Sequence, residues 1–200
     1  MVMSVADLFL AHLLDSKPRC TSFSFIAERC HEEIVRVLGH GRLPNMDDRD
    51  KLSYTYTTVN EFQRCANIVP SGVFHEMTRP TNLRGYNIPK GTEIFTNLRA
   101  ILSDKEHWKY PDTFNPENFL DGNGQFFKSE SFLPFSLGPR VCLGETLAKM
   151  ELFLFITSLL QRIRFSWPPG AKWPAMNGIV RLVRSPEPFN IICHSRGSTE

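Results

Sequence analysis

The segment ETLAKMELFLFITSLLQRIRF, residues 145–165, is the feature that most constrains the fold. Its apolar residues fall on most faces of a helix rather than on one stripe, which is typical of a helix buried in a protein core. The run LFLFI within it is far too short to cross a bilayer, which needs about 20 apolar residues. The sequence therefore predicts one long buried helix, the longest of the chain.

Shorter elements are expected before and after this helix. Apolar periodicity predicts helices over 1–15, 25–39 and 53–66, with a capped turn at 45–52. Prolines and glycines between residues 68 and 98 separate short β-prone runs and predict a small local sheet. The remaining expectations are a long functional coil over 104–134 and a C-terminal return to strands with a hairpin turn at Asn177-Gly178.

Composition narrows the class of protein. The chain has 200 residues, 42% of them hydrophobic, which suffices for one or two domains with a real core. Its 23 basic and 21 acidic residues are too balanced for a nucleic-acid binder. The five cysteines are odd in number and widely spaced, which argues against a disulfide framework or a zinc site and favours a reducing environment. MVMSVADLFLAHLL has no basic start and contains Asp7, so it is interpreted as a buried helix, and no membrane anchor is recognised.

The segment FSLGPRVCLG places one thiol directly before the long helix. Unpaired amides at the helix N-terminus would stabilise the thiolate of Cys142. Gly138 permits an unusual backbone conformation, and Gly144 leaves room for a flat group. Phe135 could shield the sulfur from water, and Arg140 offers a fork suited to a carboxylate. These are the requirements of a haem iron held by one axial thiolate.

Two other interpretations of Cys142 remain open at this point. An isolated intracellular cysteine is usually a small buried hydrophobe. A nucleophilic thiol, as in a thiol-dependent hydrolase, needs a histidine base, which separation in sequence alone does not exclude. No hydrolase-type signature surrounds Cys142.

FLPFSLGPRVCLGE resembles the haem-binding signature of the cytochromes P-450, Phe-x-x-Gly-x-Arg-x-Cys-x-Gly. Phe135, Gly138, Arg140, Cys142 and Gly144 all match it. The resemblance implies that these residues bind haem b (iron protoporphyrin). Within it, Cys142 would be the proximal iron ligand, Arg140 would contact a propionate, and Phe135 would pack beside the sulfur.

Glu61 and Arg64 resemble the family's Glu-x-x-Arg pair, which lies on the helix that buttresses the haem pocket. PENF, residues 116–119, resembles the Pro-x-x-Phe motif that completes the pair. Asn118 stands where the family often has arginine and supplies no charge, so we expect a weaker anchor. Without the family, Thr58-x-x-Glu61 also fits a capping box, and a Glu-Arg pair on an exposed helix contributes only about 0.2–0.5 kcal/mol.

NIVPSGVFHEMTR resembles the segment that leaves this helix and lines the substrate cavity, and MNGIV resembles the C-terminal turn that enters the cavity. The resemblance implies that His75 reaches a haem propionate. The implied substrate contacts are Val69, Ser71, Val73, Ile179 and Val180. Without the family, a lone histidine is more often structural, and the last two are ordinary hairpin residues.

The beginning of the chain departs from the family. SVADLFLA resembles the start of the distal helix, but Asp15 falls where the threonine of the acid-threonine pair is expected, so no catalytic residue is assigned. We expect residues 1–22 to be a degenerate remnant of that helix and 23–200 to form the haem-proximal part of a single domain. The implied fold class is mainly α with small β-sheets, the incomplete C-terminal part of the cytochrome P-450 fold.

The resemblance is strongest to the microsomal drug- and lipid-oxidising branch of vertebrate type. It implies a haem-thiolate monooxygenase that inserts one oxygen atom from O2 into a small apolar substrate, with electrons from a flavoprotein NADPH reductase. Arg140 and Lys149 would lie near the docking face for that reductase, although such charges are usually solvated surface. The family's location is the cytosolic face of the endoplasmic reticulum membrane. We expect this chain to be truncated and weakly active; the alternatives are a non-catalytic haem-binding or interaction product and a thiol hydrolase using Cys142.

Overall fold

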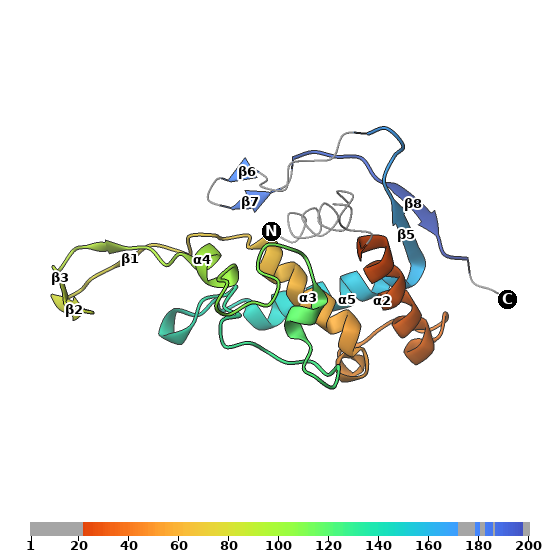
Figure 1. The fold of residues 1–200 in the computed structure, drawn as a ribbon, viewed down its shortest axis with the longest axis horizontal. Coiled ribbons are helices and arrows are strands. Elements are labelled where there is room, and N and C mark those ends of the chain that lie inside the picture. Colours follow the sequence, from red (N-terminus) through yellow and green to blue (C-terminus); the bar gives the residue numbers. More distant parts are fainter. Residues whose placement is uncertain (1–21, 172–178, 181–182, 186, 198–200) are drawn as a thin grey trace.

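Three long helices form the centre of the molecule (Figure 1). The computed structural model describes residues 22–171, 179–180, 183–185 and 187–197, so the predicted helix over 1–15 lies outside the described residues. The three helices are α2 (Ser22–Leu38), α3 (Ser53–Ala66) and α5 (Glu145–Arg162). They pack on one another around a shared apolar cluster. Its fully buried members include Cys30, Ile34, Leu52, Phe62 and Phe153.

Helices α2 and α3 and the turn between them lie where the sequence predicts them. Gly39 ends α2 in the left-handed conformation (φ +73°), and its amide donates to the carbonyl of Val35 at 2.8 Å. The predicted capped turn is the 3-10 helix η1 (Met46–Lys51). Asn45 caps it, because its side chain accepts from the Asp47 amide and its own amide donates to the Asp48 carboxylate, both at 2.9 Å.

A carboxylate from α2 caps the beginning of α3. Glu33 is buried and accepts hydrogen bonds from the amides of Tyr54 and Thr55, at 3.0 and 2.7 Å, and from the Thr55 hydroxyl at 2.7 Å. The first amides of a helix have no partner within it, and their partial positive charge favours an anion. Glu33 therefore joins two of the three central helices.

Replacing Glu33 by alanine is expected to lower the free energy of unfolding by about 1–3 kcal/mol, because the buried amides of Tyr54 and Thr55 lose their acceptor. Urea unfolding of the purified variant measures this change. Glu32→Ala is the matched control, since Glu32 is the neighbouring residue of α2 and is exposed; we expect an effect within about 0.5 kcal/mol. Equal effects of the two substitutions would contradict the capping role.

Residues 68–98 form small antiparallel ribbons, as predicted. Strand β1 (His75–Glu76) pairs with β4 (Glu93–Ile94), and β2 (Thr81–Leu83) pairs with β3 (Tyr86–Ile88). Both ribbons project at the left end of the molecule in Figure 1.

A short helix after these ribbons was missed. The β-prone run over residues 93–98 forms strand β4 at Glu93–Ile94, as predicted, but its last residue already belongs to helix α4 (Leu98–Leu102). The Asn97 side chain caps α4 by accepting from the Ala100 amide at 3.0 Å. Leu98 and Leu102, four residues apart on the helix, are both buried. Local capping and burial therefore decide this element, against the β-propensity of the residues before it.

The predicted coil over 104–134 is built around its own aromatic cluster. The buried residues of this second cluster are Leu102, Trp108, Phe119 and Phe132. The coil contains one short 3-10 helix, η2 (Pro116–Phe119), whose cap Asn115 accepts from the Glu117 amide at 3.0 Å. Apolar packing therefore orders this long connection with little regular secondary structure.

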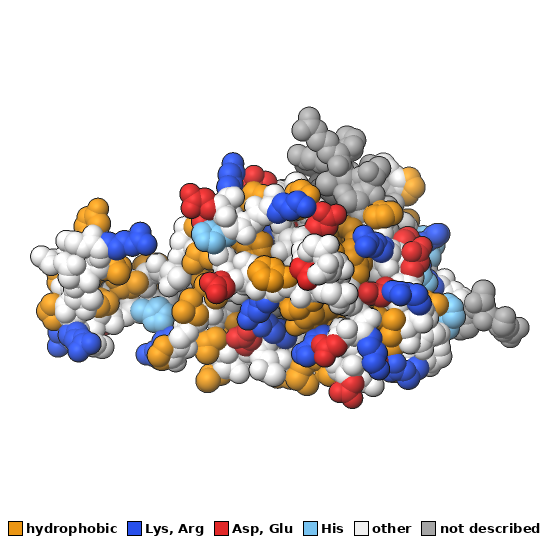
Figure 2. All heavy atoms as spheres, turned by 60° about the horizontal axis from the view of Figure 1, so that its bottom comes forward, with side chains coloured by type: hydrophobic (Ala, Val, Ile, Leu, Met, Phe, Trp, Pro, Cys, Tyr) orange, Lys and Arg blue, Asp and Glu red, His pale blue; other side chains and the backbone are white. Residues whose placement is uncertain are grey.

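Helix α5 is shorter and less buried than predicted. It ends at Arg162, and residues 163–165 belong instead to strand β5 (Ile163–Ser166), which pairs with β8 (Ile192–Ser195). One face of α5 packs on α2 and α3, whereas Leu147 and Phe155 are 59% and 57% exposed. The prediction of burial on most faces is therefore wrong for this side of the helix. Figure 2 shows apolar and charged side chains interspersed on one face of the molecule.

A short antiparallel hairpin is present near the C-terminus. Strand β6 (Ile179–Val180) pairs antiparallel with β7 (Arg184–Ser185). Asn177 and Gly178 lie before β6 and outside the described residues. In the described part of the chain, no helix combines the length and the hydropathy needed to cross a membrane.

Candidate functional site

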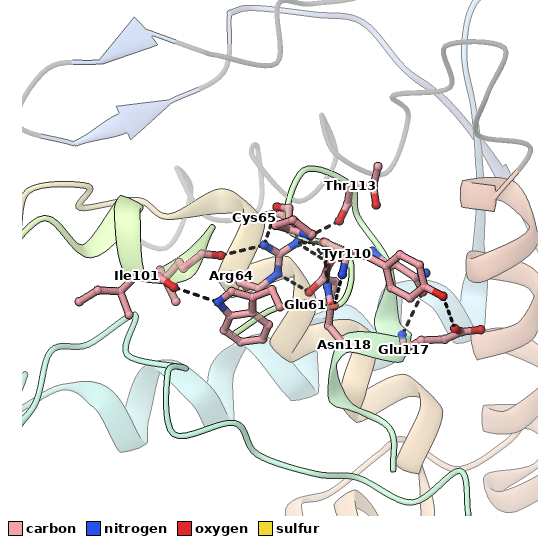
Figure 3. A network of polar contacts seen from close by, with 12 residues as sticks. Glu61, Arg64, Cys65, Ile101, Tyr110, Thr113, Glu117 and Asn118 are labelled. Atoms are coloured by element: carbon pink, nitrogen blue, oxygen red, sulfur yellow. Dashed lines mark hydrogen bonds and ion pairs between the residues drawn. The ribbon is translucent and has the colours of Figure 1, made fainter. Parts of the chain in front are cut away.

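Glu61 and Arg64 form a buried ion pair on α3 (Figure 3). Their side chains are 0% and 2% exposed. The Arg64 guanidinium binds the carboxylate through two parallel hydrogen bonds, Nε to Oε2 at 2.7 Å and Nη2 to Oε1 at 2.8 Å. Such bidentate pairs are geometrically specific, and burial makes each partner depend on the other.

The remaining Arg64 donors bind four carbonyl groups, one at the end of α4 and three in the coil that follows it. Nη1 donates to the carbonyls of Leu102 and Pro111, at 2.8 and 2.9 Å, and Nη2 donates to those of Tyr110 and Thr113, at 3.2 and 2.9 Å. One side chain therefore fixes the end of α4 and three points of the coil. This coil leads along the chain to the cysteine loop, residues 135–144.

Asn118 completes the network from the predicted PENF segment. Its Nδ2 donates to Glu61 Oε1 and to the Tyr110 carbonyl, both at 3.1 Å, and its Oδ1 accepts from the Tyr110 amide at 2.9 Å. The Asn115 amide donates to the same carboxylate oxygen of Glu61 at 2.7 Å. Asn118 therefore occupies the predicted place and brings three hydrogen bonds without a charge.

Charges in this network are set by burial and by neighbouring donors. Burial raises the pKa of the Glu61 carboxyl above its ordinary value, and the donors Arg64, Asn115 and Asn118 act in the opposite direction. Burial alone lowers the pKa of Arg64, but its hydrogen bond to Glu61 and the nearby negative groups outweigh burial, so the pKa is raised. Arg64 is therefore a permanent buried cation.

Cys65 is a member of the network that sequence reasoning missed. Its sulfur accepts from Arg64 Nη2 at 3.2 Å and donates to Glu61 Oε1 at 3.5 Å. Burial raises the pKa of this thiol well above its ordinary value, so the sulfur keeps the proton that it donates. Its position immediately after Arg64 was the only available signal.

The two structural alternatives for the Glu61 segment are wrong. Thr58 lies inside α3, where its hydroxyl donates to the Tyr54 carbonyl at 2.9 Å, so it does not cap a helix at Glu61. The pair with Arg64 is buried rather than exposed, so the small energies of surface pairs do not apply to it.

The cysteine loop closes on itself directly before α5. The Cys142 amide donates to the Phe135 carbonyl at 3.1 Å, and the Glu145 amide, the first of α5, donates to the Cys142 carbonyl at 3.2 Å. The 3-10 helix η3 (Gly138–Arg140) lies between Phe135 and Cys142. Cys142 is therefore held just before the helix N-terminus, and its side chain is exposed.

The two glycines of the loop differ in what their positions require. Gly138 has φ +74°, in the left-handed region, and a Cβ atom there would meet nothing within 4 Å. A Cβ atom on Gly144 would lie 3.8 Å from the Cys142 sulfur. Gly138 is therefore required by its backbone conformation, whereas Gly144 keeps the space beside the sulfur open.

Gly138→Ala is expected to lower the free energy of unfolding by about 1–2 kcal/mol, since a side chain disfavours the left-handed conformation while meeting no steric obstacle. Thermal and urea unfolding measure the loss. Gly122→Ala is the control, because Gly122 lies in open space without a left-handed φ. A loss no greater than that of the control would show that the loop does not depend on this conformation.

Phe135 does not have the shielding role predicted for it, whereas the position of Arg140 is compatible with its predicted role. Phe135 is half-buried, with the Lys149 ammonium 5.6 Å from its ring centroid, while Lys149 also pairs with Glu145. Because Cys142 is exposed, Phe135 does not shield its sulfur from solvent, contrary to the prediction. Arg140 is exposed and forms no hydrogen bond or ion pair with the described residues, so its guanidinium can meet an added carboxylate.

The cysteines of the described residues separate into two kinds. Burial raises the pKa of the Cys30 thiol to about 12 and that of the Cys65 thiol well above its ordinary value, so both thiols stay protonated. Cys142 and Cys193 are exposed. The interpretation as a small buried hydrophobe therefore applies to Cys30 and is wrong for Cys142.

No histidine among the described residues hydrogen-bonds to Cys142. His31 bonds the Leu160 carbonyl, His107 bonds Asp104, and His194 bonds Ser166, at 3.0, 3.1 and 2.9 Å. The described structure thus supplies no base for the thiol-hydrolase alternative.

The cysteine loop has the donor set that an iron porphyrin needs. A soft sulfur is exposed beside a glycine, and Arg140 provides an exposed cation for a carboxylate. Apolar side chains that a porphyrin face could cover are also exposed in and next to the loop. These are Leu137, Val141, Leu143 and Leu147.

The other residues predicted to contact haem or substrate form no hydrogen bond with the cysteine loop in the described structure. His75 is half-buried in β1, opposite Ile94, and forms no hydrogen bond with that loop in the described structure. Val69 is half-buried, while Ser71 and Val73 are exposed. Ile179 is 40% exposed in β6. Val180 follows it in the strand, and its side chain is outside the described residues.

Comparisons with known proteins agree with the signature. The family described as Cytochrome P450 matches residues 25–193. The chain is 54% identical over 147 residues to Cytochrome P450 2J3 of Rattus norvegicus; the aligned region covers 74% of the chain and 29% of that relative. It is 46% identical over 197 residues to Cytochrome P450 2D6 of Homo sapiens (94% of the chain, 39% of the relative). It is 42% identical over 203 residues to Cytochrome P450 2D15 of Canis lupus familiaris (98% and 41%). The chain thus spans about two fifths or less of the length of these relatives.

Proposed function

The chain belongs to the cytochrome P450 family, and on this premise we propose that it carries the haem-proximal part of a haem-thiolate monooxygenase with Cys142 as the axial ligand. The observation that carries the proposal is the geometry of Cys142. It is an exposed thiol in a closed loop, just before the N-terminus of α5, with Gly144 leaving the space beside the sulfur open.

Each loop residue has one task in this proposal. Cys142 supplies the thiolate, and the partial positive charge at the beginning of α5 favours that anion. Arg140 would pair with a propionate carboxylate, and Phe135 would pack beside the sulfur. His75 is a second propionate partner. When bound, the thiolate-ligated haem supplies the chemistry that inserts one oxygen atom from O2 into an apolar organic substrate.

Glu61, Arg64 and Asn118 act indirectly, as positioning residues. They hold the coil that leads to the cysteine loop, and Arg64 alone binds three carbonyl groups of this coil and one at the end of α4. A ligand loop must keep its sulfur fixed relative to the iron for the bond to remain strong. The buried pair meets that requirement without touching the cofactor.

The partners and the location follow from the family. We propose a flavoprotein NADPH reductase as electron donor and small apolar molecules as substrates, as expected of the microsomal drug- and lipid-oxidising branch. The cytosolic face of the endoplasmic reticulum is the corresponding location. The candidate substrate contacts Val69, Ser71, Val73 and Ile179 are all at least partly exposed, as a ligand-binding wall requires.

We further propose that this chain, as it stands, is a weak catalyst. Asp15 stands at the place of the distal threonine, and it lies outside the described residues. Proton delivery to bound oxygen needs a controlled acid-base pair in a dry pocket. The chain loaded with haem and mixed with a reductase is expected to oxidise apolar model substrates slowly; rates typical of complete family members would contradict this.

A haem titration tests the proposed function itself. Stepwise addition of haem to the purified chain should give saturable binding of one haem per chain, followed by the haem absorbance and by quenching of tryptophan fluorescence. Absence of uptake would contradict the proposal and favour a non-catalytic interaction product. Hydrolysis sensitive to thiol reagents, without haem, would favour a thiol hydrolase.

A further inference from the structure

Arg184, on β7, is a buried cation outside the network of Glu61 and Arg64. The residue is only 7% exposed, although arginine is rarely buried without partners. Its Nη1 donates to the carbonyls of Cys65 and Ala66, at 3.0 and 3.1 Å, and its backbone amide donates to the Ile68 carbonyl at 2.8 Å. We propose that Arg184 clamps the β6–β7 hairpin to the end of α3, and so positions two segments as one apolar ligand-binding wall.

The end of α3 explains why a guanidinium fits there. The last carbonyl groups of a helix have no partner within it and carry partial negative charge. Asn67 ends α3 in the left-handed conformation (φ 38°), and its amide reaches only the Gln63 carbonyl, at 3.2 Å. The carbonyl groups of Cys65 and Ala66 therefore need a donor from outside the helix. Arg184 supplies both hydrogen bonds and the complementary positive charge.

The clamp joins the two segments that carry the candidate substrate contacts. The Ile68 carbonyl, bound by the Arg184 amide, directly precedes Val69 in the first segment. In the second, Val180 pairs directly with Arg184, and Ile179 is the next residue of β6. The Arg99 amide also holds the first segment, by donating to the Pro70 carbonyl at 3.0 Å.

The proposed role of the clamp is to set which apolar molecules bind, and this part rests on the proposed function. Val73 is 62% exposed and Ile179 40% exposed, so both segments have apolar surface for a ligand to cover. A fixed wall binds a bulky ligand better than a mobile one because less conformational freedom is lost on binding. Arg184 does not itself reach the ligand in this proposal; it is a positioning residue.

Hydrogen exchange tests the clamp without any haem. In Arg184→Met, which keeps the length of the side chain and removes its donors, amides of residues 179–185 should exchange at least about tenfold faster than in the wild type. The Arg99 amide should be unchanged. Arg184→Lys, which keeps the charge, should show a smaller acceleration. Arg164→Met is the matched control, because Arg164 is exposed on β5. Unchanged exchange of the hairpin in Arg184→Met would overturn the clamp.

Two probe ligands test the effect on selectivity. Imidazole and 4-phenylimidazole both bind haem iron, and only the second adds a bulky apolar group. In haem-loaded Arg184→Met, the dissociation constant of imidazole should stay within about twofold of the wild type, whereas that of 4-phenylimidazole should rise about fivefold or more. An equal change for both ligands, with the hairpin released, would overturn the role in selectivity.

Hydrogen exchange and ligand binding test separate parts of the proposal. If the wild type bound neither probe, the proposed function and the role of Arg184 in selectivity would both be contradicted. The exchange rates would still show whether Arg184 holds the hairpin on α3. If the wild type bound both probes and the hairpin of Arg184→Met exchanged as in the wild type, the proposed function would stand and the clamp would fall.

Discussion

Arg64→Met is expected to lower the free energy of unfolding by about 3–5 kcal/mol, because it leaves the Glu61 carboxylate buried without its cation. This loss is a large fraction of the 5–15 kcal/mol by which domains are usually stable. The substitution also frees the four carbonyl groups that Arg64 binds, one at the end of α4 and three in the coil. We therefore expect the variant to unfold at a clearly lower urea concentration than the wild type, as measured by circular dichroism during urea titration.

A control and a double variant make this prediction specific. Arg49→Met removes a partly exposed arginine that pairs with the exposed Asp50, and surface pairs of this kind contribute about 0–1 kcal/mol. Glu61→Leu combined with Arg64→Met should be less destabilised than Arg64→Met alone, since no charge remains buried. If Arg64→Met lost no more stability than Arg49→Met, the buried pair would not hold the coil.

Much of the helical fold could be predicted from the sequence because the signals were local. Gly39 ends α2, and α3 was predicted with its observed bounds from periodicity. The cysteine loop was predicted from its motif, and its backbone shows why Gly138 belongs there. In each case the residues that set the conformation are adjacent in the sequence.

The errors arose where distant contacts decide the structure. Residues 163–165 continue the helical pattern of α5, but pairing with β8 makes them a strand. The apolar residues of α5 could not reveal that only one of its faces meets α2 and α3. Cys65 and Arg184 carry no local signal of their roles, since Arg184 binds carbonyl groups more than a hundred residues earlier in the chain.

Cys142→Ser is expected to have the largest effect on haem. A serine hydroxyl is a hard, neutral ligand at neutral pH, whereas iron in this proposal is held by a soft thiolate. Loss of an outer-shell partner alone costs metal sites about 10- to 100-fold in affinity, so loss of the ligand itself should cost at least as much. The variant should keep the wild-type fold, because Cys142 is exposed and only its backbone takes part in the loop hydrogen bonds.

Cys193→Ser is the matched control, since Cys193 is the other exposed cysteine among the described residues and lies on β8. It should bind haem as the wild type does. Comparable loss of haem in both variants would mean that the sulfur of Cys142 has no special role.

The most direct measurement is the absorbance spectrum of the reduced carbon monoxide complex, recorded for the wild type and both serine variants at equal haem content. We expect the red-shifted Soret band that is specific to thiolate ligation in the wild type and Cys193→Ser, and its complete absence in Cys142→Ser. A thiolate-type band that persists in Cys142→Ser, or that is absent from the wild type with haem bound, would contradict Cys142 as the iron ligand.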